Sequence, residues 1–308
     1  MAEIVISEFM DQAAIHESFA GRDVLYDPKL VDDPTRLMDA VCEARALIVR
    51  NRTQVRGPLL EAAVRLRVVG RLGVGLDNID VATCEARGIA VFPATGANNL
   101  SVAEYVITAA LLLLRRAWLA TDRVVAGEWP RTELMGRELA GKRLGLVGLG
   151  AIARVTAGMA RGLGMSVAAF DPLLPAEHPA WADAERQALP ALLAASDVVS
   201  LHVPLTAATR NMIDAVALAV MKRDAILINA ARGGIVDEAA LAAALKAGRL
   251  GGAALDVFDR EPLDAVAAAK FAGAPNLILT PHIAGVTEES NVRVSSVTAQ
   301  AVLRHLLT

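Results

Sequence analysis

The stretch that most constrains the fold is 144–171, which reads LGLVGLGAIARVTAGMARGLGMSVAAFD. An apolar run leads into Gly148-Leu149-Gly150, a helical pattern over 152–163 follows, and a second apolar run ends at Asp171. This order predicts a strand, a tight turn, a helix and a second strand. Glycines at these two positions permit a sharp turn and the close approach of a ligand. The first amides of the helix are therefore expected to bind a pyrophosphate.

The acid that closes this stretch indicates which cofactor it binds. Asp171 lies 21 residues after Gly150, where a carboxylate can accept hydrogen bonds from the ribose hydroxyls of an adenosine. A 2′-phosphate would be repelled there, so we expect NAD rather than NADP. Ala153 stands at the third position of the glycine fingerprint, which tolerates alanine.

Composition bounds the remaining possibilities. The 308 residues suggest about two domains, and 54% hydrophobic with 21% charged residues indicates a globular chain with a large core. A net charge of -3 argues against a nucleic-acid partner. Cys42 and Cys84 fit neither a disulfide framework nor a metal site, so we expect no metal and a cytoplasmic location. Neither the acidic N-terminus nor the short apolar run over 106–114 indicates a signal peptide or a membrane partner.

Short apolar strands alternate with helical patterns along the chain, which favours parallel sheets covered by helices. The strands expected before the glycine turn are 4–7, 24–26, 46–49, 68–70 and 89–92, and those expected after Asp171 are 198–201, 225–229, 252–256 and 277–279.

Three longer helices are expected. The first runs from Asn99 to about Ala126, with Ser101 and Glu104 at the spacing of a capping box. The others cover 237–247 and 288–307. Too few residues follow the final strand to form a domain of their own, so we expect the last helix to return to the first block.

Three stretches place polar residues at predicted carboxyl ends of strands, where open α/β sheets bind their ligands. Arg232 can hold a carboxylate in bidentate fashion and polarise the neighbouring carbonyl. His282 can take up or supply a hydroxyl proton, and Glu261 can accept the other imidazole N–H and stabilise the charged ring. Together they suit the transfer of a hydride to or from a carbonyl carbon.

At this point the sequence resembles the D-isomer-specific 2-hydroxyacid dehydrogenases, especially the 3-phosphoglycerate dehydrogenase-like branch. The resemblance covers nearly the whole chain and depends on the motifs GRLGVGLDNID (70–80), NNLSVAEY (98–105), GLGAI (148–152), NAARGGIVDE (229–238), ALDVFDREP (254–262) and TPHIAG (280–285). It implies an α/β fold of two doubly wound parallel-sheet domains, a Rossmann cofactor domain (98–285) inserted in a flavodoxin-like substrate domain (1–97 and 286–308). It also implies an active site in the cleft and a homodimer formed through the cofactor domain.

The resemblance also implies residue roles. Its catalytic residues fall on Arg232, Glu261 and His282. The cofactor contacts that we expect are Val74, Gly148, Gly150, Ala151, Ile152, Asp171, His202, Val203, Pro204, Ala230, Ala231, Arg232, Asp256, His282 and Gly285. His202 is expected on the adenine side and Asp256 at the nicotinamide amide.

The substrate is expected to be a small 2-hydroxy acid with a second anionic group, as in 3-phosphoglycerate or sulfolactate. Several arginines suggest this, and the substrate-binding residues that we expect are Arg50, Asn51, Arg71, Val74, Gly75 and Arg131. Asn51 and Val203 depart from the phosphoglycerate enzymes, which leaves the substrate open.

Other functions remain as alternatives. One is a hydroxypyruvate or glyoxylate reductase. Another is a non-catalytic protein that senses dinucleotides, resembling the corepressors related to this family. A formate dehydrogenase is disfavoured because its relatives carry glutamine where Glu261 stands.

Overall fold

The computed structural model describes residues 2–308, and the chain divides into two compact units. Unit 1 comprises Met1–Asn98 and Val286–Thr308, and unit 2 comprises Asn99–Gly285. Both are α/β units in which every paired strand of the sheet is parallel to its neighbours. The predicted fold class is confirmed.

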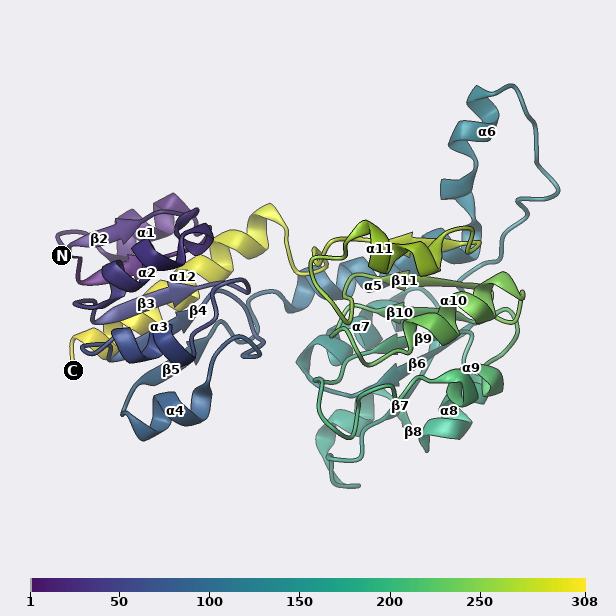
Figure 1. Ribbon diagram of the computed structural model, residues 1–308. Coiled ribbons are helices and arrows are strands. Elements are labelled where there is room, and N and C mark those ends of the chain that lie inside the picture. Colours follow the sequence, from purple (N-terminus) through teal and green to yellow (C-terminus); the bar gives the residue numbers. More distant parts are fainter. Residues whose placement is uncertain (1) are drawn as a thin grey trace. The chain divides into compact units, whose positions relative to one another are not determined.

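Unit 1 contains a five-stranded sheet of order β2-β1-β3-β4-β5 (Figure 1). Its elements are β1 Ile4–Ile6, α1 Gln12–Ser18, β2 Val24–Tyr26, η1 Leu30–Asp32, α2 Pro34–Val41, β3 Ala46–Val49, α3 Gly57–Ala62, β4 Val68–Arg71, α4 Val81–Ala86, β5 Ala90–Pro93 and α12 Glu288–Leu306. This strand order is that of flavodoxin-like sheets.

Alternating strand residues supply two core layers in unit 1. Ile4 and Ile6 face a layer shared with α1 and α12, while Val5 faces the layer beneath α2 and α3. Helix α12 packs closely on β4, because a Cβ at Gly70 would lie 2.7 Å from the side chains of Thr298 and Val302. Helix α12 thus covers one face of the sheet that residues 4–93 form.

Unit 2 contains a seven-stranded sheet of order β12-β11-β10-β9-β6-β7-β8. Its elements are α5 Asn99–Arg115, η2 Ala117–Leu119, α6 Thr121–Val125, β6 Arg143–Val147, α7 Ala151–Gly162, β7 Ser166–Phe170, η3 Pro179–Asp183, β8 Glu185–Arg186, α8 Leu189–Ala195, β9 Val198–Leu201, α9 Ala215–Val220, β10 Ile226–Asn229, α10 Glu238–Lys246, β11 Gly252–Leu255, α11 Ala265–Ala268, η4 Ala269–Phe271 and β12 Leu277–Leu279. The order reverses between β6 and β9, the switch point of a Rossmann sheet.

The helix expected over 99–126 is wrong in its second half. Helix α5 ends at Arg115, and Arg116 has a left-handed backbone with φ 54°. Two short helices, η2 and α6, follow it. The break arises from packing, since Arg137 N donates to Leu114 O and Gly136 lies against the Arg115 backbone.

The capping box expected at Ser101 is also wrong, because α5 begins two positions earlier, at Asn99. The capping box that forms joins Thr287 and Ser290 at the start of α12.

Candidate functional site

The glycine turn lies at the switch point of the sheet in unit 2. Gly148 has φ 92°, and a Cβ there would lie 2.5 Å from His202 O, so only glycine lets the turn approach the end of β9. Gly150 is the N-cap of α7 and makes no side-chain capping bond, while a Cβ there would meet no atom within 4 Å. The start of α7 therefore offers uncapped amides beside open space, which suits a pyrophosphate.

Asp171 follows β7 and lies beside this turn. Its carboxylate accepts hydrogen bonds from Leu149 N at 2.9 Å and Leu173 N at 3.0 Å, one on each oxygen. Each oxygen retains a lone pair, so the group can also accept hydrogen bonds from two ribose hydroxyls. The turn, the helix start and the acid together fit a dinucleotide.

His202, Val203 and Pro204 follow β9 on the other side of the switch point. His202 Nε2 lies 3.0 Å from Ser200 Oγ, and burial lowers the pKa of His202 to about 4. The ring is therefore neutral at physiological pH. A neutral, partly buried ring suits packing against a base better than it suits proton transfer at neutral pH.

The loop after β10 carries Ala230, Ala231 and Arg232. The Asn229 side chain fixes it, because its amide donates to Arg232 O at 2.9 Å and its oxygen accepts from Ala231 N at 3.1 Å. Gly233 brings this loop against the next, since a Cβ there would lie 1.7 Å from Phe258 O. Arg232 is thereby held close to the loop that carries Glu261.

Glu261 and His282 form a direct pair in unit 2. His282 Nδ1 lies 2.7 Å from Glu261 Oε2, and Glu261 Oε1 accepts from Phe258 N at 3.0 Å. Burial alone would raise the pKa of Glu261, but the hydrogen bond and the charge interaction with His282, aided by Arg232, hold it below its usual value. Because Nδ1 faces the carboxylate, Nε2 is the imidazole nitrogen left for a substrate.

Asp256 directly follows strand β11 and is buried. Its carboxylate accepts from Thr280 Oγ1 at 2.6 Å and from Ile283 N and Ala284 N at 2.8 Å each. It therefore fixes the segment that carries His282. The Tyr105 hydroxyl lies 2.6 Å from Thr280 Oγ1, a contact that the sequence analysis missed because no spacing pattern links the two positions.

Arg50, Asn51, Arg71, Val74 and Gly75 lie in unit 1, at the carboxyl ends of β3 and β4 and in the loop after β4. Val49 pairs with Arg71 in the sheet, so Arg50 and Arg71 start from adjacent strand ends. The Arg50 guanidinium donates to Asn291 Oδ1 at 2.6 Å and lies 5.8 Å from the Phe9 ring centroid. A Cβ at Gly73 would lie 1.7 Å from Arg71 Nη1, so glycine there lets the guanidinium fold over the loop.

Arg131 and Gly285 belong to unit 2. Arg131 is exposed, and its backbone N donates to Trp129 O at 2.9 Å. The structure therefore places Arg50 and Arg71 at adjacent strand ends of unit 1, whereas Arg131 belongs to unit 2.

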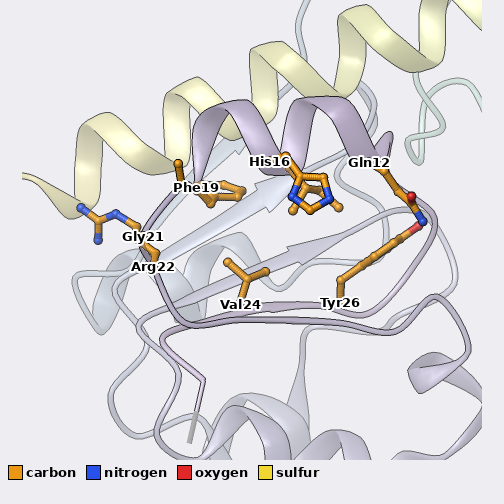
Figure 2. Close-up of a pocket in the computed structure, with 9 residues that line it drawn as sticks. Gln12, His16, Phe19, Gly21, Arg22, Val24 and Tyr26 are labelled. Carbon is orange, nitrogen blue, oxygen red and sulfur yellow. The ribbon is translucent and has the colours of Figure 1, made fainter.

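A separate hollow lies in unit 1 between α1 and the edge strand β2 (Figure 2). It is lined by His16, Phe19, Arg22, Val24 and Tyr26 among others, none of which is an expected site residue. The Arg22 guanidinium is paired with Glu3 at 3.0 Å. This hollow therefore contributes nothing to the candidate site.

Residues 2–308 contain no cluster of three or more His, Cys, Asp or Glu side chains that could hold a metal ion. Within the same range, every helix is too short or too polar to cross a membrane.

The strand order, the glycine turn and Asp171 define unit 2 as a dinucleotide-binding domain of the Rossmann class. A sequence model of the D-isomer specific 2-hydroxyacid dehydrogenase NAD binding domain matches residues 107–284. The chain belongs to the D-isomer-specific 2-hydroxyacid dehydrogenases. It is an oxidoreductase of 2-hydroxy acids with NAD as its cofactor, as the sequence analysis predicted.

Two named relatives and one solved structure are similar over almost the whole chain. The (S)-sulfolactate dehydrogenase of Chromohalobacter salexigens is 55% identical over 307 residues, which are 99% of each chain. The D-3-phosphoglycerate dehydrogenase of Synechocystis sp. is 37% identical, and the match covers 100% of this chain but 54% of that protein. The D-lactate dehydrogenase of Aquifex aeolicus, solved with NAD and lactic acid, has a TM-score of 0.86 at 29% identity, covering 97% of this chain and 93% of that one.

Proposed function

We propose that this protein catalyses the reversible NAD-dependent oxidation of a small 2-hydroxy acid that carries a second anionic group, with sulfolactate as the leading candidate. The observation that carries the proposal is the 2.7 Å pair between His282 and Glu261, held beside the Arg232 loop in the unit that contains the glycine turn. Residues 98–285 would form the cofactor domain, and residues 1–97 with 286–308 the substrate domain.

In this proposal the chain moves one proton and holds one carboxylate. Arg232 binds the substrate carboxylate and polarises the adjacent C–O bond. During oxidation His282 Nε2 accepts the hydroxyl proton, and Glu261 stabilises the resulting imidazolium through Nδ1–H. During reduction the same proton is returned to the carbonyl oxygen. Bound NAD supplies the acceptor, or as NADH the donor, of the hydride.

The cofactor-binding residues follow from the same geometry. The amides of Ala151 and Ile152 would hold the pyrophosphate, next to Gly148 and Gly150, and Asp171 the adenosine ribose. The remaining cofactor contacts in the proposal are Val74, His202, Val203, Pro204, Ala230, Ala231, Asp256, His282 and Gly285.

The second anion is assigned to arginines. Arg50, Arg71 and Arg131 would bind it, with Asn51, Val74 and Gly75 around the substrate carboxylate. Burial lowers the pKa of Arg50, although the nearby Glu8 carboxylate acts in the opposite direction. The guanidinium itself donates to the neutral amide of Asn291. Arg52, by contrast, is already paired with the Asp32 carboxylate. A guanidinium that hydrogen-bonds to a neutral amide retains more attraction for an incoming sulfonate or phosphate than one in a direct ion pair with a carboxylate.

A homodimer in the cytoplasm completes the proposal. Residues 116–136 extend away from the body of unit 2 and return to the end of α5, and α6 projects from that body (Figure 1). In this excursion Val125 is 83% exposed and Trp129 is 82% exposed. Exposure of such apolar side chains to water is unfavourable, and contact with a second copy of this chain would bury them. Cys42 and Cys84 are both free thiols, which suits a reducing compartment.

Steady-state kinetics with single variants test the catalytic assignment. We expect His282→Asn and Arg232→Ala to lower kcat/KM by about 10²- to 10⁴-fold, the usual cost of removing a positioned acid or base, while the fold survives. Near wild-type turnover in His282→Asn would overturn the proton-transfer role. NADH binding without turnover on any 2-keto acid would favour the alternative of a dinucleotide sensor.

A further inference from the structure

The segment 280–284 carries His282 in a backbone conformation that its surroundings must hold. His282 has φ 58°, in the left-handed region that residues other than glycine rarely adopt. Its N–H donates to Asp256 O at 2.8 Å, and the next two amides, of Ile283 and Ala284, donate to the Asp256 carboxylate. A change in the position of the Asp256 carboxylate would therefore move the His282 imidazole.

A directed chain of hydrogen bonds ends on that carboxylate. An ionised carboxylate only accepts, so the Thr280 hydroxyl donates to Asp256 Oδ1 at 2.6 Å. Thr280 has no second proton, so the 2.6 Å contact with Tyr105 requires the tyrosine to donate. Burial raises the pKa of Tyr105 to about 12, so its hydroxyl keeps this proton throughout the working pH range.

Tyr105 connects the loop to a rigid element. It lies within α5, and its ring packs against the core cluster formed by α5, α7 and one face of the sheet. The hydroxyl thus reaches from an anchored helix to the side chain that orients Asp256. Replacing it with phenylalanine would remove the hydrogen bond and keep the packing of the ring.

We propose that Tyr105 is a positioning residue for the reaction, which acts through Thr280 and Asp256 to hold His282 in its left-handed conformation. The inference rests on the proposed role of His282. It assigns to α5 a part in aligning the imidazole with the substrate hydroxyl, in addition to its part in the core.

The chain offers a matched control because it contains two tyrosines. The Tyr26 hydroxyl donates to Met10 O at 3.0 Å in unit 1, outside the proposed site. We expect Tyr105→Phe to lower kcat about tenfold, as for one lost hydrogen bond of about 1.4 kcal/mol, with KM for NADH and keto acid nearly unchanged. Tyr26→Phe should leave kcat unchanged. A kcat for Tyr105→Phe within about twofold of wild type would overturn the inference.

Variants of Thr280 test the chain independently. Thr280→Ser keeps the hydroxyl and should retain most of kcat, whereas Thr280→Val should lose at least as much as Tyr105→Phe. Adding Tyr105→Phe to Thr280→Val should cost little more, because the chain is already broken. Multiplicative losses in the double variant would overturn the inference. His282→Asn, measured alongside, separates the two proposals: if it stays active the proposed function fails, whereas an active Tyr105→Phe beside an inactive His282→Asn defeats only the role of Tyr105.

Discussion

The two carboxylate oxygens of Glu261 have different partners. Oε1 accepts a hydrogen bond from the backbone amide of Phe258, and Oε2 is hydrogen-bonded to His282 Nδ1. The pKa of Glu261 lies below its usual value, so the carboxylate stays ionised at neutral pH. The Glu261 carboxylate is therefore available to stabilise a positive charge on the His282 ring.

Glu261→Gln should move the pH profile in a defined direction. Keto acid reduction needs the protonated imidazole, and the Glu261 carboxylate stabilises that form. Without this charge the protonated ring loses its stabilising partner, so the alkaline limb of the reduction profile should lie at lower pH in Glu261→Gln than in wild type. The measurement is kcat/KM for reduction between pH 5 and 10. Asp259→Asn is the matched control, since Asp259 is exposed and pairs with Arg210 at 3.4 Å. An unchanged or upward-shifted profile for Glu261→Gln would contradict the pairing.

For individual residues, the sequence was sufficient to identify candidate catalytic side chains but not the contacts that position them. Arg232, Glu261 and His282 were found because each follows a strand of a parallel sheet, where side chains from separate segments converge. Tyr105 was not found, because 175 positions separate it from Thr280 and a hydroxyl on a helix gives no periodic signal. Their contact depends on how α5 packs beneath the sheet.

Helix α7 combines a ligand-facing start with an ordinary helical body. Gly150 at its N-cap and Gly158 within it both face open space, because a Cβ at either would meet no atom within 4 Å. The two positions differ in what they border. Gly150 borders the proposed pyrophosphate, and Gly158 lies two turns further along the exposed side of the helix.

Alanine at these two glycines should therefore have opposite consequences. Gly150→Ala should weaken NADH binding about tenfold, or about 1.4 kcal/mol, because its methyl group would meet the pyrophosphate. Gly158→Ala should leave NADH binding unchanged and stabilise the protein by about 0.5–1 kcal/mol through helix propensity. Fluorescence titration with NADH and thermal unfolding measure the two effects. Equal NADH affinity in both variants would show that the pyrophosphate does not lie at the start of α7.

Most helices and strands could be predicted from local sequence patterns. The helix expected over 99–126 could not, because a tertiary contact ends it. Helix formers continue past Arg115, with neither proline nor glycine before Gly127, so the sequence favoured one long helix. The structure ends α5 there because the returning chain at Gly136 and Arg137 packs against its last turn. A local sequence pattern cannot report a contact made by residues that return from a distant excursion.

At the scale of the molecule, the proposed role of residues 116–136 in dimer formation can be tested. If it binds a second copy of this chain, Val125→Asp should shift the protein from dimer to monomer in sedimentation velocity, because a charge would be buried in the interface. Val266→Asp is the matched control, since Val266 is 87% exposed on α11 and lies outside the excursion. A wild-type protein that sediments as a monomer would contradict the dimer.

The sequence anticipated the α/β class and the two parallel sheets because hydrophobic runs and glycine turns are local signals. The substrate could not be predicted in the same way, because substrate specificity depends on a few guanidinium groups whose partners are determined by tertiary packing. Arg50 and Arg52 look alike in the sequence, yet one faces Asn291 and the other pairs with Asp32. Only the structure distinguishes them.

The most direct test of the account is kcat/KM with NADH for the keto acids of sulfolactate, phosphoglycerate and lactate, in wild type, Arg50→Ala and Arg52→Ala. We expect a keto acid with a second anion to exceed pyruvate by at least about tenfold in wild type, the worth of one charge-assisted contact. That preference should shrink by about the same factor in Arg50→Ala and persist in Arg52→Ala. Pyruvate as the best substrate, with the same ranking in Arg50→Ala, would contradict the account.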